Sequence, residues 1–260
     1  MGATPASEAV RFGMIVPSSN VTMEREIPSL LGLHAERFAF HSSRVRMRSV
    51  TPEELAAMNA QSSRACGELA DAQVDVVAYA CLVAVMAEGP GAHRRAEERL
   101  AGELAAEGSS APVVSSAGAL VDTLAVLGAE RVGVIAPYAP ALTERVCAYL
   151  RAEGVDPVHV RSLGVTDNTA VGRLDPSGLP PIAREIPSDI DALVLSACVQ
   201  MPSLPVLAAV EQELGIPVLS AATATVFQSL RRLGQPTTVP GGGHLLSGAF
   251  DALTGAGKEQ

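Results

Sequence analysis

VDVVAYACLVAVM, residues 74–86, and DALVLSACVQM, residues 191–201, decide the fold. Each is a run of β-branched and apolar residues that reaches an Ala-Cys pair. A short run without alternation predicts a strand that is buried on both faces, as in a parallel sheet flanked by helices. Cys81 and Cys198 then lie where these strands end. Ligands of open α/β sheets bind at the carboxyl ends of the strands, so both thiols are candidate active-site groups.

The chain around the two strands repeats itself. RFGMIVP at residues 11–17 matches RVGVIAP at 131–137, and APVVS at 111–115 matches IPVLS at 216–220. Together with the cysteines, these landmarks recur in the same order, at offsets of 120, 117 and 105 residues. A period of this length indicates a duplicated domain, because solenoid repeats are only about 20–50 residues long. Strands that alternate with helices predict right-handed βαβ units and a parallel sheet in each half.

The predicted fold class is therefore α/β, with two pseudo-symmetric lobes that each contain a parallel sheet flanked by helices. Duplication would turn the carboxyl ends of the two sheets toward each other. We therefore expect the active site in the cleft between the lobes, with Cys81 and Cys198 on opposite sides. The glycine-rich segment 240–260 is expected to close one lobe and then fray.

The composition argues against several classes of function. The net charge is −9 and the chain has one lysine, Lys258, so the surface does not favour a nucleic acid. No apolar run reaches the roughly 18 residues of a membrane span, and residues 1–13 lack the pattern of a signal peptide. A cytoplasmic protein without membrane contact is expected. The cysteines form no CxxC pair and the histidines no HExxH motif, so neither a disulfide framework nor a metal site is predicted.

The four cysteines divide into two pairs. A cysteine on an apolar strand is usually a packing residue, because a free thiol behaves as a small hydrophobe. Equivalence across the repeat instead favours a function for Cys81 and Cys198. A following helix N-terminus would lower the pKa of such a thiol and would bind carboxylates. Cys66 and Cys147 lie in predicted helices and have no counterpart in the repeat, so both are interpreted as packing residues.

Neutral hydrogen-bond donors are expected on the same rim. Asn20 and Tyr138 follow matching strands of the two halves, and Asn168 is placed at the end of the next strand. Such groups suit carboxylate oxygens, although Asn20 could equally cap a helix and Asn168 could be a turn residue. The arginine-rich segment 44–48 could also reach the rim, but a solvated face is the usual place for arginines.

Several of these stretches resemble a known family. VPSSNVTMEREIP, FAFHSSRVRM, YACLVAVM, PVVSSAGALVD and LSACVQMPSLP closely resemble maleate cis-trans isomerases of the aspartate/glutamate racemase superfamily. The similarity runs from about residue 11 to residue 250. The two cysteine motifs together are specific, whereas a single Ala-Cys pair would mean little. Val21 departs from the pattern, because a second threonine is expected after Asn20.

The resemblance implies a conversion of maleate to fumarate without a cofactor. Cys81 would add to the double bond, and Cys198 would handle the proton at the neighbouring carbon. The resemblance also implies a homodimer of two-lobed subunits, with residues 1–118 and 222–260 in the N-terminal lobe and 119–221 in the C-terminal lobe. The substrate carboxylates would be bound by side chains of Asn20, Tyr138 and Asn168 and by backbone amides at Leu82, Val83 and Val199.

This chemistry agrees with the residues. The double bond of maleate cannot rotate, and addition of a thiolate converts it into a single bond that can. An amino-acid racemase of the same superfamily would also use two cysteines. Its relatives tend to carry polar residues after the cysteines, whereas Leu82 and Val199 are apolar. A malonate decarboxylase of the same superfamily resembles a one-cysteine version, and a non-enzymatic binding protein on this fold would not need two thiols.

Overall fold

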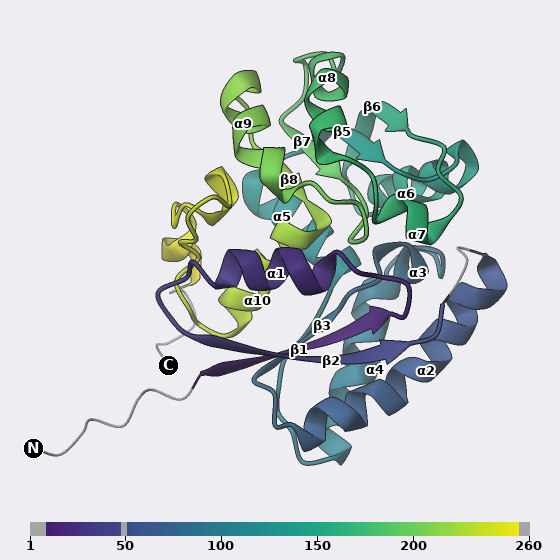
Figure 1. Cartoon of the computed structure of the whole chain (residues 1–260), viewed down its shortest axis with the longest axis vertical. Coiled ribbons are helices and arrows are strands. Elements are labelled where there is room, and N and C mark those ends of the chain that lie inside the picture. The colour runs from purple at the N-terminus through teal and green to yellow at the C-terminus, as the bar shows by residue number, and fades with distance from the viewer. Residues whose placement is uncertain (1–8, 48–50, 255–260) are drawn as a thin grey trace, which may run out of the picture.

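The structure is a computed structural model that describes residues 9–47 and 51–254. It contains two four-stranded sheets in which all neighbouring strands are parallel (Figure 1). The first sheet has the order β2-β1-β3-β4 and the second the matching order β6-β5-β7-β8. The strands are β1 (Val10–Pro17), β2 (Phe38–Val45), β3 (Val76–Tyr79), β4 (Val113–Ser115), β5 (Arg131–Ala136), β6 (Asp156–Ser162), β7 (Ala192–Ser196) and β8 (Val218–Ser220). The predicted fold class and the predicted duplication are confirmed.

Helices flank both sheets. In the first half, α2 packs with α4 on one side of the sheet and α1 packs with α10 on the other (Figure 1). In the second half, α6 contacts β6, and α9 contacts β8. The helices are α1 (Met23–Leu31), α2 (Pro52–Asp71), α3 (Leu82–Met86), α4 (Ala92–Ala106), α5 (Ser116–Leu127), α6 (Pro140–Ala152), α7 (Asn168–Val171), α8 (Leu179–Arg184), α9 (Leu204–Leu214) and α10 (Ala221–Arg232).

The two decisive strands occupy the same position in their sheets. Every residue of β3 and of β7 is buried, which explains why neither stretch alternates between polar and apolar residues. The strand that pairs with each of them, β1 or β5, contains a glycine for a steric reason. A Cβ at Gly13 would lie 3.0 Å from Val74, and one at Gly133 would lie 2.9 Å from Ile186. The glycine shared by RFGMIVP and RVGVIAP therefore reflects close packing in each half.

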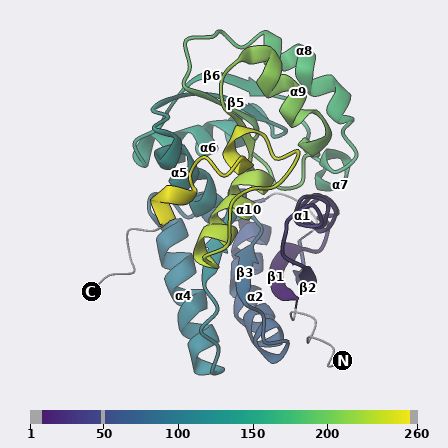
Figure 2. The ribbon, with the colours of Figure 1, turned by 90° about the vertical axis from the view of Figure 1, so that its left-hand side faces the viewer.

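The chain returns to the first sheet after β8. Helix α10 packs against α5, α1, β3 and β4, and Gln228 donates from α10 to Thr123 Oγ1 on α5. The following segment runs beside α10 (Figure 2), and it buries Leu245 and Leu246 in the short 3₁₀ turn His244–Leu246. The predicted boundaries at residues 118 and 222 stay a prediction. The expected fraying at 255–260 lies outside the described residues.

Two local predictions are wrong. The Asp-Pro, Ser-Gly and Leu-Pro-Pro pairs from Asp175 to Pro181 predict a loop, but the segment contains a 3₁₀ turn (Pro176–Gly178) and the start of α8. Pro180 and Pro181 fit there because the first turn of a helix has no intrahelical use for their missing N–H groups. Asn168 does not end a strand: β6 stops at Ser162, and Asn168 begins α7.

Candidate active site

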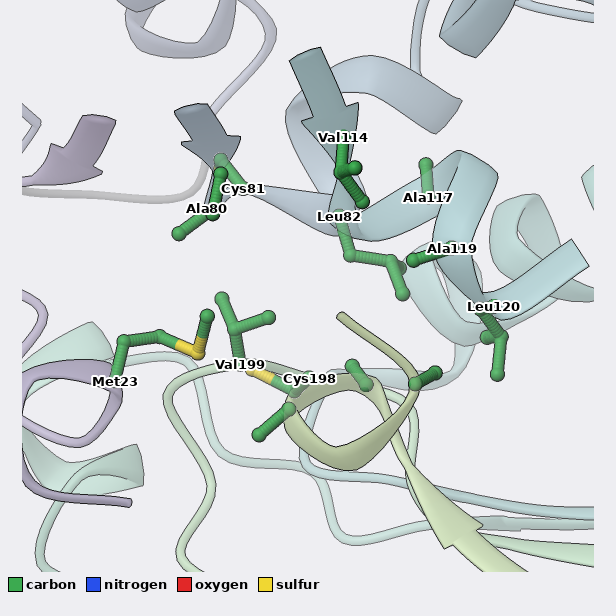
Figure 3. Packing of buried hydrophobic residues seen from close by; sticks show 14 of the residues in the cluster. Met23, Ala80, Cys81, Leu82, Val114, Ala117, Ala119, Leu120, Cys198 and Val199 are labelled. Atoms are coloured by element: carbon green, nitrogen blue, oxygen red, sulfur yellow. The ribbon is translucent and has the colours of Figure 1, made fainter. Parts of the chain in front are cut away.

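Cys81 and Cys198 lie close together at the junction of the two halves. Each follows its central strand by two residues, Cys81 after β3 and Cys198 after β7. Their exposed fractions are 3% and 5%. Burial is the main cause that raises the pKa of Cys81, and a charge on Cys198 adds to it, as expected for neighbouring thiols. Figure 3 shows Cys81 between Ala80 and Leu82 on one side of the junction and Cys198 beside Val199 on the other.

Cys81 precedes a helix directly. It is the N-cap residue of α3, and the backbone N–H of Ala84 supports its sulfur. Burial nevertheless raises the pKa of the Cys81 thiol to about 12, with the nearby Cys198 adding to the rise. The predicted lowering of this pKa is therefore wrong, because burial outweighs the lowering by the Ala84 N–H. One N–H group of a five-residue helix does not compensate for the loss of water around the sulfur.

Cys198 has a more polar environment. Its sulfur accepts hydrogen bonds from the Tyr138 hydroxyl and from the backbone N–H groups of Gln200, at 3.3 Å, and Met201. Burial still raises the pKa of Cys198 above its usual value, while these three donors oppose the rise. No helix follows until Leu204, which overturns the expected helix N-terminus at this thiol. The loop is instead fixed by Ser196 Oγ, which donates to the Cys198 carbonyl at 2.8 Å.

Tyr138 follows β5 and is 3% exposed. Desolvation raises its pKa well above 10, and charges on Cys198 and Cys81 raise it further. The phenol therefore stays protonated and can donate to a thiolate or to a carboxylate. The structure places this candidate against both thiols.

The two asparagines hold the halves together in this structure. Asn20 is buried, and its Oδ1 accepts from the N–H groups of Thr22, at 2.9 Å, and Met23, at 3.1 Å, so it supports the start of α1 although the N-cap residue itself is Thr22. Its Nδ2 also reaches the carbonyl of Val199, at 3.4 Å, across the junction. Asn168 Nδ2 donates to Ser19 Oγ, at 2.6 Å, from the opposite half.

The backbone candidates are buried beside the thiols. Leu82 and Val83 form the first turn of α3, where N–H groups need acceptors from outside the helix. Val199 follows Cys198 directly and contacts Asn20 through its carbonyl. These positions agree with a site that binds an anion between the sheets, and their role stays a prediction.

Two contributors to this region were missed or given little weight. Gln200 has no predicted role from the sequence, yet it is 2% exposed and bonds to residues of both halves. Arg44 donates from β2 to the carbonyls of Ser18 and Asn20, so one arginine of the segment 44–48 does brace the rim. The departure at Val21 has little consequence because its backbone N–H makes the contact, at 3.0 Å to Gln200 Oε1.

The remaining cysteines lie elsewhere. Cys66 is buried in α2 and Cys147 in α6, and burial raises the pKa of each thiol to about 11. Across residues 9–47 and 51–254, no group of three or more histidine, cysteine, aspartate or glutamate side chains could hold a metal ion. None of the helices described there is both long enough and apolar enough to cross a bilayer.

Comparisons with known proteins agree with this geometry. Residues 12–246 match the arylmalonate decarboxylase family model. The maleate isomerase of Geobacillus stearothermophilus is 52% identical over 246 residues, which cover 92% of this chain and 98% of that protein.

Two solved structures are also similar. A cysteine-to-alanine variant of the maleate isomerase from Pseudomonas putida S16, with maleate, has a TM-score of 0.91 at 51% identity and covers 93% of this chain and 99% of its own. A cysteine-to-serine variant of the Nocardia farcinica maleate cis-trans isomerase carries a covalently bound succinylcysteine intermediate. It has a TM-score of 0.90 at 52% identity and covers 92% of this chain and 99% of its own. The resemblance is thus confirmed, and the chain belongs to the arylmalonate decarboxylase family and, within it, to the maleate isomerases.

Proposed function

We propose that this protein isomerises maleate to fumarate through a covalent succinyl-cysteine on Cys81, without a cofactor. The observation that carries the proposal is the pair of buried thiols at equivalent strand ends of facing sheets. The succinylcysteine intermediate in the Nocardia farcinica relative supports the covalent route. The racemase alternative is not favoured, because the relatives that are 51–54% identical are maleate isomerases.

The reaction divides into two half-reactions. The Cys81 thiolate adds to one alkene carbon, and the neighbouring carbon takes the proton of the Cys198 thiol, which becomes a thiolate. The former double bond is now single and rotates. Cys198 then removes a proton from the same carbon, the bond from carbon to Cys81 breaks, and fumarate leaves. Protons and charges balance over the cycle, and both thiols return to their starting states.

The substrate is held by neutral donors. Asn20, Tyr138 and Asn168 would bind the carboxylates together with the backbone N–H groups at Leu82, Val83 and Val199. The asparagine amides now bond to protein acceptors, so each would exchange an acceptor for a carboxylate oxygen. Neutral donors suit this reaction because one carboxylate must be released and bound again during rotation, and they hold it less rigidly than a bidentate arginine.

The proposal extends to assembly and location. The subunit is expected to form a homodimer and to act in the cytoplasm, as the family resemblance implies. Light scattering after size-exclusion chromatography would test the dimer, since it should give twice the 26.7 kDa mass of one chain. A mass of one chain at micromolar concentration would contradict it.

Proton NMR tests the reaction directly. The purified protein, after dialysis against EDTA, should convert maleate to fumarate without any addition and should leave L-aspartate unchanged. Exchange at Cα of aspartate, with maleate untouched, would favour the racemase. Activity that disappears on dialysis and returns with a metal ion would contradict the cofactor-free route.

A further inference from the structure

Gln200 makes an unusual set of contacts for a residue without an assigned role. Its side chain is buried, and all three of its hydrogen bonds are to backbone groups of loops that carry candidate site residues. Oε1 accepts from Val21 N–H at 3.0 Å, and Nε2 donates to the carbonyls of Ser19, at 2.8 Å, and Asn168, at 3.0 Å. An amide is the side chain that can accept on one atom and donate twice on the other.

These contacts connect three parts of the site. Ser19 and Val21 flank Asn20 in the first half, and Asn168 belongs to the second half. The backbone of Gln200 joins the third part, because its N–H donates to Cys198 Sγ at 3.3 Å. Its carbonyl also accepts from Thr22 Oγ1 at 2.7 Å. One residue therefore fixes both asparagines relative to a thiol.

Access of a substrate to the buried thiols depends on the loops that Gln200 connects. Cys81 and Cys198 are at most 5% exposed, so a dicarboxylate reaches them only when the surrounding loops separate. Separation of the Asn20 loop from the Asn168 loop breaks bonds to the Gln200 amide, and closure restores them. The amide therefore weights the equilibrium between open and closed forms.

We infer that Gln200 is a positioning residue that closes the site over the dicarboxylate and sets the distance between the Asn20 and Asn168 loops and Cys198. The inference rests on the proposed isomerase function. Gln200 acts through the loops and takes no part in the bond-making steps.

The first test is Gln200→Ala, with Gln228→Ala as its control. Gln228 is also a buried amide, but it bonds to Thr123 in the contact between α10 and α5. Without the Gln200 bonds the closed form is less populated, so KM for maleate should rise about 10- to 100-fold. Saturating maleate restores the closed form, so kcat should stay within about threefold of wild type. Gln228→Ala should lower the Tm and leave both constants unchanged.

The second test, Gln200→Glu, uses pH. A carboxylate cannot donate to the carbonyls of Ser19 and Asn168, whereas a protonated carboxyl group can donate once. The ratio of kcat/KM in this variant to that in wild type should therefore rise as the pH falls from 8 to 5. A Tm measured at each pH separates this effect from a change in stability.

The third test moves the amide without replacing it. A Cβ at Gly172 would lie 2.7 Å from Gln200 Nε2, and the α-helical φ of −69° at this position tolerates alanine. The same Cβ would lie 3.1 Å from Val21 Cγ2, on a side chain that is 44% exposed and has room to move. As a single variant, Gly172→Ala should raise KM. In a Gln200→Ala background it should cause no further rise, because the shortened side chain at residue 200 leaves space for the methyl group.

The outcomes separate this inference from the proposed function. If wild type does not form fumarate, the isomerase proposal fails. If wild type is active, three results would overturn the role of Gln200. These are unchanged constants in Gln200→Ala, a fall in kcat with unchanged KM, and additive effects of the Gly172 and Gln200 substitutions.

Discussion

The two central strand ends are equivalent in topology but differ in what surrounds their thiols. After β3 the chain turns directly into α3, and the Cys81 sulfur has one supporting backbone N–H, from Ala84. After β7 the chain continues as a loop to Leu204, and the Cys198 sulfur has two backbone N–H groups and the Tyr138 hydroxyl. Both thiols have raised pKa values because both are buried, but only Cys198 has several donors that oppose the rise.

The difference fits a division of labour. A nucleophile loses its charge when its bond to carbon forms, and a thiolate with little stabilisation is the more reactive one. A proton donor gains charge at the same moment and must keep it for the lifetime of the intermediate. Donors around Cys198 stabilise that charge in a buried site. The surroundings therefore support the proposed roles of Cys81 in addition and Cys198 in proton transfer.

The largest effect is expected from Cys81→Ser. A serine hydroxyl is far harder to ionise than a thiol, so the addition step should stop and turnover should fall on the order of 10⁴-fold or more. Fumarate formation followed by proton NMR gives the rate, and circular dichroism confirms the fold. A variant that keeps a tenth of the wild-type rate would place the nucleophile elsewhere.

Cys198→Ala should slow turnover less completely and should trap the intermediate. Addition at Cys81 can still occur, with the proton taken from solvent while the site is open, but the adduct then lacks the group that removes its proton again. Mass spectrometry after incubation with maleate should show an increase of about 116 Da, the mass of maleic acid, on the peptide that contains Cys81. An adduct on Cys198 in Cys81→Ala, with none on Cys81 in Cys198→Ala, would reverse the roles of the two residues.

Tyr138→Phe tests the polar side of the comparison. The hydroxyl donates to Cys198 and opposes the rise of its pKa, so its removal should raise that pKa further. At neutral pH, breakdown of the adduct should slow about 10- to 100-fold, because less of the Cys198 thiolate survives. In single-turnover measurements the rate of breakdown should keep rising to a higher pH than in wild type. An unchanged pH profile would mean that the Tyr138 hydroxyl binds the substrate and does not affect the pKa of Cys198.

The sequence predicts those features of the two strand ends that depend on the internal repeat and on the burial of apolar residues. The apolar runs before Cys81 and Cys198 predict buried parallel strands, and their repetition predicts two equal sheets. Asn20 and Tyr138 lie where predicted because the residue after a buried strand reaches the same sheet edge in each half.

The missing parts depend on contacts distant in sequence. Gln200 bonds to Val21, 179 residues away, and no local pattern marks such a partner. The pKa values of the thiols were expected to fall because a helix N-terminus is visible in the sequence. The enclosure that raises them is not visible there, since it arises from both halves together. The predicted position of Asn168 at a strand end is wrong because Asp167 is the N-cap residue of α7, and its side chain accepts from Ala170 N–H.

The smallest effect is expected from the pair of cysteines without equivalents. Cys66→Ala and Cys147→Ala should keep wild-type turnover and lower the free energy of unfolding by about 1 kcal/mol each at pH 7, through the small cavities that they leave. Turnover abolished in either variant, with the fold intact, would show that the wrong thiols were chosen.

The same variants carry a pH signature. Burial raises the pKa of both thiols to about 11 in the folded protein, whereas the unfolded chain releases these protons near the ordinary pKa of about 8.5. Between those values the unfolded state binds fewer protons, so wild-type stability falls as the pH rises. An alanine variant lacks one of these thiols, so its deficit should shrink from pH 7 to pH 10 in urea unfolding experiments. If the loss in free energy of unfolding is the same at pH 7 and pH 10, the folded thiols ionise as readily as unfolded ones. Burial would then not raise the pKa of Cys66 and Cys147.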